Sequence, residues 1–81
     1  MKVKSWFIRR EEEKARVYHC WIDIDSRDER GTICEDENGF FDVRGKVLKE
    51  TEKAAYVLLS TGDFDGSVMG WKTWIPKSLM A

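Results

Sequence analysis

The residue types that bind transition metals are few in this chain. His19, Cys20 and Cys34 are the only His and Cys residues. A zinc site needs four ligands in a tetrahedron, typically supplied as two close pairs. There is no second close pair, and in a strand over residues 15–24 the neighbours His19 and Cys20 would point to opposite faces. We therefore expect no metal site, with Cys20 as a core residue and both cysteines reduced.

A calcium loop is the next chemistry that the acidic residues suggest. Asp23, Asp25 and Asp28 are followed by Gly31, but an EF-hand needs oxygen ligands at positions 1, 3 and 5 and Gly at position 6. Counted from Asp23, the fifth position is Arg27 and the sixth is Asp28. The EF-hand pattern therefore fails. If this loop binds a cation at all, the alternative is a non-specific site for a divalent ion.

Catalysis has no recognisable signature. The sequence lacks a nucleophile elbow, a Gly-rich phosphate loop and a Cys with a designated base, and its single His limits acid–base chemistry to carboxylates and lysines. We expect a protein that is not an enzyme, with no catalytic residue and no cofactor.

Charge is distributed unevenly. The chain has 81 residues and a net charge of −1, which argues against binding to nucleic acid or membranes by bulk charge. Residues 23–42 contain eight acidic residues against two arginines. Such a stretch is either a solvated rim, a surface for a basic partner, or a mimic of nucleic-acid phosphates. We expect an unknown protein partner, bound through Asp23, Asp25, Asp28, Glu29, Glu35, Asp36, Glu37, Asp63, Phe64 and Asp65.

Phe64 is part of that prediction because of its setting. It lies between two Asp and two Gly residues in a predicted hairpin loop over residues 62–67. An apolar ring there either tucks back onto the fold or contacts a partner.

The alternative function is single-stranded nucleic-acid binding. Small barrels combine aromatic rings, which stack on bases, with basic residues that contact phosphates. The candidates are Arg44, Lys46, Lys49, Lys53, Lys72 and Trp71. In a domain this small, aromatic residues are more often part of the core.

Hydropathy patterns predict mostly strands. Residues 2–8 alternate, residues 32–34 precede an Asn38-Gly39 hairpin turn, and residues 40–51 contain Gly45, which is typical of a bulge. Residues 53–61 are apolar on both faces, which indicates a central strand. A strand over residues 68–75 ends at Pro76, followed by one helical turn.

Residues 9–24 are ambiguous. Residues 15–24 are rich in β-branched and aromatic residues, which favours a strand, whereas Glu11, Glu12, Glu13 and Lys14 favour a helix. We predict one mainly β domain, a small antiparallel barrel or meander of five or six strands, SH3-like or OB-like. The alternative is an α+β fold with a short helix near residues 9–18.

The second half of the chain resembles a family of short phage and mobile-element proteins. The segment at residues 50–54 reads Glu-Thr-Glu-Lys-Ala, and the segment at residues 74–78 reads Trp-Ile-Pro-Lys-Ser. The resemblance covers about residues 46–80 and implies no established biochemical activity. Together with the lack of a catalytic signature, we expect a non-enzymatic binding module of a phage or mobile element. A purely structural reading is that the first motif is a polar hairpin corner and the second ends a strand.

The apolar segments of the sequence indicate where the protein is located, and its predicted first strand bears on its oligomeric state. No stretch approaches the roughly 20 apolar residues of a membrane span, and the longest early apolar run is too short for a signal peptide. We expect a cytoplasmic protein that does not bind membranes. Its oligomeric state is open, since an edge strand over residues 2–8 could pair with a second copy.

Overall fold

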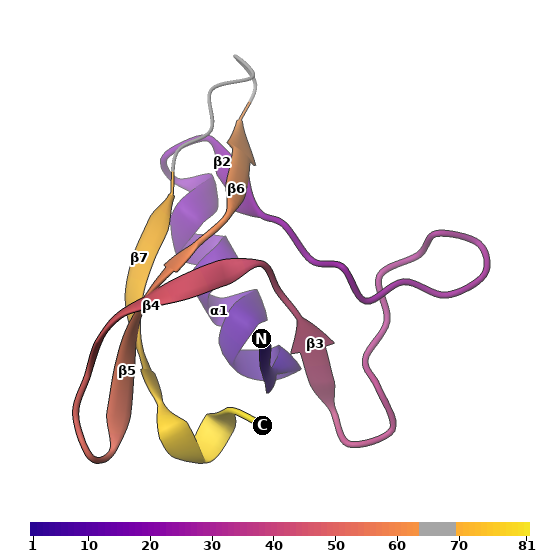
Figure 1. Ribbon diagram of the computed structural model, residues 1–81. Helices are drawn as coiled ribbons and strands as arrows, with labels where there is room; N and C mark the ends of the chain where they lie inside the picture. Colours follow the sequence, from indigo (N-terminus) through magenta and orange to yellow (C-terminus); the bar gives the residue numbers. More distant parts are fainter. Residues whose placement is uncertain (64–69) are drawn as a thin grey trace.

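A computed structural model of the chain describes residues 1–63 and 70–81 (Figure 1). These residues form a mainly β fold with one α-helix. The elements in chain order are β1 (Lys2–Lys4), α1 (Ser5–Arg16), β2 (Cys20–Ile22), β3 (Phe40–Asp42), β4 (Gly45–Glu50), β5 (Ala54–Leu59), β6 (Thr61–Asp63), β7 (Trp71–Pro76) and the 3-10 helix η1 (Lys77–Leu79).

The strands form three separate antiparallel sheets. The largest has the order β4-β5-β7, and the two others are the pairs β1-β3 and β2-β6. The mainly β prediction is confirmed, but the predicted closed barrel is wrong. Closure needs every strand to be hydrogen-bonded to a neighbour on both sides. Several strands here have only three residues, because the chain continues into a helix or a loop, and each of these strands pairs with one neighbour in a separate sheet.

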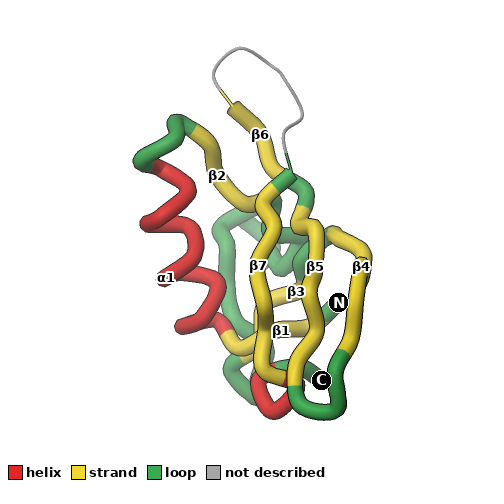
Figure 2. The backbone as a smooth tube through the Cα atoms, turned by 90° about the vertical axis from the view of Figure 1, so that its left-hand side faces the viewer, coloured by secondary structure: helices red, strands yellow, loops and turns green. Residues whose placement is uncertain are grey.

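One hydrophobic core lies between the inner face of β4-β5-β7, the helix and the two small sheets. Val57, Leu59 and Ile75 come from the large sheet, Phe7 and Ile8 from α1. In Figure 2 the large sheet lies in front, α1 lies beside β7, and β1 and β3 lie behind. No element of the described chain packs over the other face of the large sheet.

The start of the chain corrects two strand predictions. The predicted strand over residues 2–8 ends at Lys4, and α1 follows directly from Ser5. The predicted strand over residues 15–24 is wrong outside Cys20–Ile22, because the helix extends to Arg16 and His19 has a φ of 61°. The α+β alternative is closer, although the helix begins before residue 9.

The segment of residues 25–39 is an excursion of two turns rather than a strand. The predicted strand at residues 32–34 is reduced to one bridge between Ile33 and Arg27. Asp28 and Asp36 each organise a turn by accepting two backbone N–H groups. Gly39, at a φ of 82°, supplies the predicted turn, but β3 after it pairs with β1 instead of forming a hairpin.

The second half follows its pattern more closely. β5 is the central strand of the large sheet, as predicted. Burial on both faces, which its apolar residues also suggested, is not found, because β5 alternates buried with half-buried residues. The bulge lies between Val47 and Lys49, not at Gly45. β7 ends at Pro76 and the predicted helical turn follows as η1.

The predicted dimerisation edge at residues 2–8 is not a free edge. Val3 pairs with Phe41 on one side and forms a bridge with Met80 on the other. The remaining residues of that stretch are helical. Among the described residues, no helix is long and apolar enough to cross a membrane.

Candidate functional site

The open face of β4-β5-β7 is the surface on which aromatic and basic side chains gather. Antiparallel partners point to the same side of a sheet. Leu58 is paired with Lys46 and Lys72, and Tyr56 is paired with Lys49 and Trp74, so all six side chains lie on this face. We call these six residues the outer-face cluster.

Two rings stand at the middle of the outer-face cluster. Tyr56 and Trp74 contact each other with ring centroids 5.1 Å apart and planes inclined by 36°. Tyr56 is half-buried, whereas Trp74 keeps 46% of its surface exposed. Tyr56 packs against the Trp74 ring and orients it. The exposed surface of Trp74 is therefore open to a planar group.

Three lysines surround these rings without neutralisation. Lys46, Lys49 and Lys72 are exposed, and none has a carboxylate within ion-pair distance among the described residues. No paired position on this face of the three strands is acidic. As far as residues 1–63 and 70–81 show, the outer-face cluster therefore carries three ammonium groups without an ion-pair partner beside an exposed indole.

The remaining predicted nucleic-acid contacts lie elsewhere. Arg44 pairs with Asp25 at 3.1 Å, and Lys53 lies in the β4–β5 turn. Trp71 belongs to the inner face, where its Nε1 donates to Glu11 and its ring contacts Tyr18. The sequence prediction thus included the three lysines but missed Tyr56 and Trp74.

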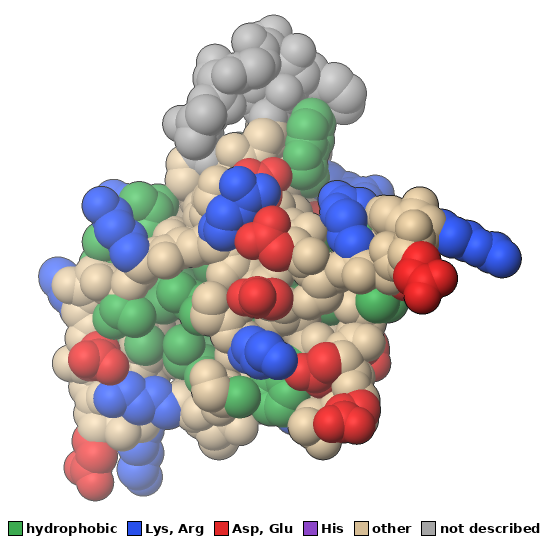
Figure 3. All heavy atoms as spheres, turned by 45° about the vertical axis from the view of Figure 1, so that its right-hand side comes forward, with side chains coloured by type: hydrophobic (Ala, Val, Ile, Leu, Met, Phe, Trp, Pro, Cys, Tyr) green, Lys and Arg blue, Asp and Glu red, His purple; other side chains and the backbone are tan. Residues whose placement is uncertain are grey.

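The predicted acidic surface is largely engaged within the fold. Asp23 accepts a hydrogen bond from Ser60, Asp25 pairs with Arg44, and Glu35 accepts from Ser5 and lies near Arg9. Acidic and basic side chains are interspersed over this side of the molecule (Figure 3). Such a surface is closer to neutral than the acidic count suggests.

The turn acids have a structural role. Asp28 Oδ1 accepts the N–H groups of Arg30 and Thr32. The hydrogen bond from the Phe40 N–H, together with those from the Asn38 N–H and the Lys2 ammonium, holds the pKa of Asp36 below its ordinary value. Of the seven predicted acids between residues 23 and 37, only the exposed Glu29 and Glu37 have a carboxylate that accepts no hydrogen bond and forms no ion pair within the described ranges.

The loop prediction is mostly outside the described residues. Phe64 and Asp65 lie outside them. Asp63 is described for its backbone alone, as the last residue of β6, where it pairs with Cys20. The structure therefore does not test the role assigned to these three residues.

Behind the outer-face cluster, β7 is fixed to the helix by a buried carboxylate. Glu11 of α1 accepts hydrogen bonds from Thr73 Oγ1 and Trp71 Nε1 and pairs with Lys14 at 3.0 Å. Burial alone raises the pKa of Glu11, but these donors outweigh it and leave the pKa below its ordinary value. The contact holds the strand that carries Lys72 and Trp74 against the helix.

Within the described part of the chain, no group of three or more His, Cys, Asp or Glu residues could hold a metal ion. No family model, curated protein or solved structure matches the chain. The resemblance of residues 46–80 to phage and mobile-element proteins therefore stays a prediction.

Proposed function

We propose that the protein binds single-stranded nucleic acid on the outer-face cluster. The observation that carries this proposal is the exposed Trp74, which packs against Tyr56. Among the described residues, the three lysines near it have no ion-pair partner, and no paired position on this sheet face is acidic. Single-strand binders combine aromatic rings, on which bases stack, with cations that contact the phosphates. A duplex keeps its bases stacked inside and offers the ring nothing to stack on.

The geometry supports a short binding site. One exposed indole provides stacking for one base, and the half-buried Leu58 provides an apolar neighbour. Lys46 and Lys72 lie across from each other at Leu58, while Lys49 lies opposite Tyr56. A strand of a few nucleotides can therefore place one base on Trp74 with phosphates near lysines on both sides.

A protein partner of the acidic stretch has less support. That hypothesis needs free carboxylates, and most of the predicted ones bind a backbone N–H, a hydroxyl or a cation of the same chain. Breaking those contacts would cost the turns of residues 25–39 part of their order.

The test is a binding titration by fluorescence anisotropy. Short labelled oligothymidylate, oligouridylate and a duplex of the same length are titrated with the protein at low salt. We expect both single strands to bind more tightly than the duplex. With about 0.7 counterions released per phosphate, three lysine contacts predict a slope of about −2 for log K against log salt.

Variants locate the site. Trp74→Ala removes the stacking surface, which is worth about 1–3 kcal/mol for one base, so binding weakens by roughly fivefold to a hundredfold. The matched control is Trp6→Ala, because Trp6 is also half-exposed but lies on α1. Arg30→Gln serves as a charge control for Lys72→Gln. Equal losses in the Trp74 and Trp6 variants, or no binding at low salt, would refute the proposal.

A further inference from the structure

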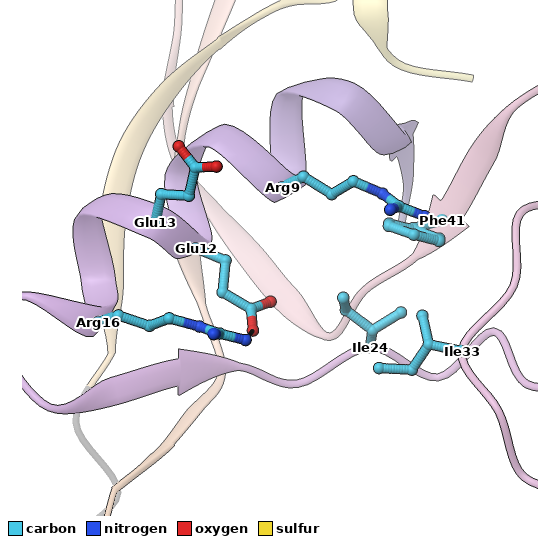
Figure 4. A pocket seen from close by; sticks show the side chains of 7 residues that line it. All are labelled: Arg9, Glu12, Glu13, Arg16, Ile24, Ile33 and Phe41. Carbon is cyan, nitrogen blue, oxygen red and sulfur yellow. Dashed lines mark hydrogen bonds and ion pairs between the residues drawn. The ribbon is translucent and has the colours of Figure 1, made fainter.

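A concave site lies on the flank of α1 that faces away from β7. It is a pocket of about 400 Å³ between the helix and the chain around residues 24–41. Ile24, Ile33 and Phe41 form its floor, and Arg9, Glu12 and Arg16 line its helical wall (Figure 4). Glu13, also at the pocket, turns its carboxylate away from the others in that view. The lining is thus an apolar floor beside a few charged groups.

Arg9 is the residue that gives this pocket chemical character. Its guanidinium lies over the Phe41 ring, 5.2 Å from the centroid, which orients it across the apolar floor. Its nearest carboxylate, Glu35 Oε1, is 3.9 Å away, beyond hydrogen-bond distance. The Arg9 guanidinium forms no hydrogen bond with the described part of the chain, so its N–H donors are available to a ligand.

The other charged groups restrict what that ligand can be. Glu12 and Arg16 neutralise each other at 3.2 Å. The Glu35 carboxylate, 3.9 Å from the Arg9 guanidinium, would repel a ligand with several negative charges. A monoanion is therefore a better match than a phosphate, and a carboxylate can take two parallel hydrogen bonds from a guanidinium.

The apolar floor of the pocket determines which apolar group the ligand must carry. Ile33 keeps 41% of its surface exposed and is the main apolar surface of the pocket, because Ile24 and Phe41 are buried, at 6% and 1% exposed. Covering an aliphatic side chain gains about 25 cal/mol for each Å² removed from water. The ligand thus needs an aliphatic group close to its carboxylate.

We propose that this pocket binds the C-terminal residue of a peptide whose last side chain is large and aliphatic. Such a residue carries a single carboxylate and an aliphatic group on one carbon atom, which matches Arg9 next to Ile24 and Ile33. The aliphatic group contacts the apolar floor of the pocket at Ile33, and the carboxylate accepts hydrogen bonds from the Arg9 guanidinium. The site does not depend on the outer-face cluster. Its lining comes from α1 and from residues 24, 33 and 41, whereas the cluster lies on the open face of β4-β5-β7.

The test is an NMR titration of the full chain with N-acetyl-L-leucine as the probe. We expect saturable, millimolar binding with amide and methyl shift changes at Ile24, Ile33 and Phe41. N-acetyl-L-leucinamide lacks the carboxylate and acetate lacks the aliphatic group, so each should bind about tenfold more weakly or worse. Shift changes spread over the whole surface, or none at all, would overturn the proposal.

Variants separate the charge from the fold. Arg9→Gln should abolish the preference for N-acetyl-L-leucine over its amide, whereas Arg10→Gln should keep it. Arg10 is the matched control because it is the next residue of α1 and also lies over aromatic rings, those of Trp6 and Phe7. If Arg9→Gln does not fold, the comparison of the acid with the amide on the unmodified chain decides: equal affinity for the two would overturn the role of Arg9.

Discussion

The buried carboxylate of Glu11 is the polar link between α1 and β7. Three donors converge on it, from Lys14, Trp71 and Thr73. Glu11→Gln replaces an ionised acceptor by a neutral amide, which weakens these bonds. We expect the free energy of unfolding at neutral pH to fall by about 1–3 kcal/mol, measured by urea denaturation. Glu13→Gln, on the exposed side of the same helix, should change it little.

The same substitution should change the pH dependence of stability. The pKa of Glu11 in the folded protein lies below its ordinary value of 4.5, so the unfolded chain binds more protons as the pH falls. The stability that Glu11 contributes is complete above its ordinary pKa and is lost as the pH falls through the lowered one. The difference between the unmodified chain and Glu11→Gln should therefore shrink in acid. A difference that stays constant would contradict this account.

Thr61 offers the opposite kind of substitution. It is buried, and its hydroxyl has no hydrogen-bond partner in the described part of the chain. Thr61→Val replaces that hydroxyl by a methyl group of similar size and removes an unsatisfied polar atom from the core. We expect the free energy of unfolding to rise by about 1 kcal/mol. A fall of that size in urea denaturation would indicate that the hydroxyl does find a partner.

At the level of elements, the β4–β5 pairing depends on the absence of a side chain at Gly45. A Cβ there would lie 2.6 Å from the Leu58 carbonyl oxygen and 3.2 Å from Leu59 Cα. Since both atoms belong to the backbone, Gly45→Ala must push the two strands apart. We expect a loss of about 1–3 kcal/mol in the free energy of unfolding. Lys46→Ala, at the exposed next position, is the control and should be nearly neutral in the same measurement.

The helix shows why hydropathy alone was misleading for one element and sufficient for another. β5 was predictable because its residues are apolar on both faces, which is typical of a central strand. The buried positions of α1 include Phe7, Ile8, Glu11 and Ala15. The apolar stripe is interrupted at Glu11, whose burial depends on donors from β7, about sixty residues further along the chain. No local pattern contains that information.

At the scale of the whole molecule, order should decrease from the large sheet to the excursion of residues 25–39. β5 is hydrogen-bonded on both sides, whereas the excursion is held by two Asp-centred turns and isolated bridges. Hydrogen exchange should therefore be slowest at β5 amides and fastest within residues 25–35. Equal protection in both regions would contradict this ranking.

The candidate site could be predicted only in part, and the reason is also one of scale. Lys46, Lys49 and Lys72 were recognisable as basic residues near strands. Their convergence on Tyr56 and Trp74 depends on the register of three strands and on the bulge after Val47. Register is set by packing across the sheet. The sequence alone therefore does not show that Trp71 lies on the inner face of the sheet and Trp74 on its open face.

The four tryptophans stand in four different environments. Trp6 lies on the exposed side of α1 beneath an arginine, and Trp21 packs against the backbone at Gly62 in the β2–β6 ribbon. Trp71 donates to Glu11 between α1 and β7, and Trp74 stands on the open sheet face. Variants that retain one indole each would therefore turn the chain into a set of optical reporters, whose emission separates unfolding of the helix, the ribbon and the sheet within one experiment.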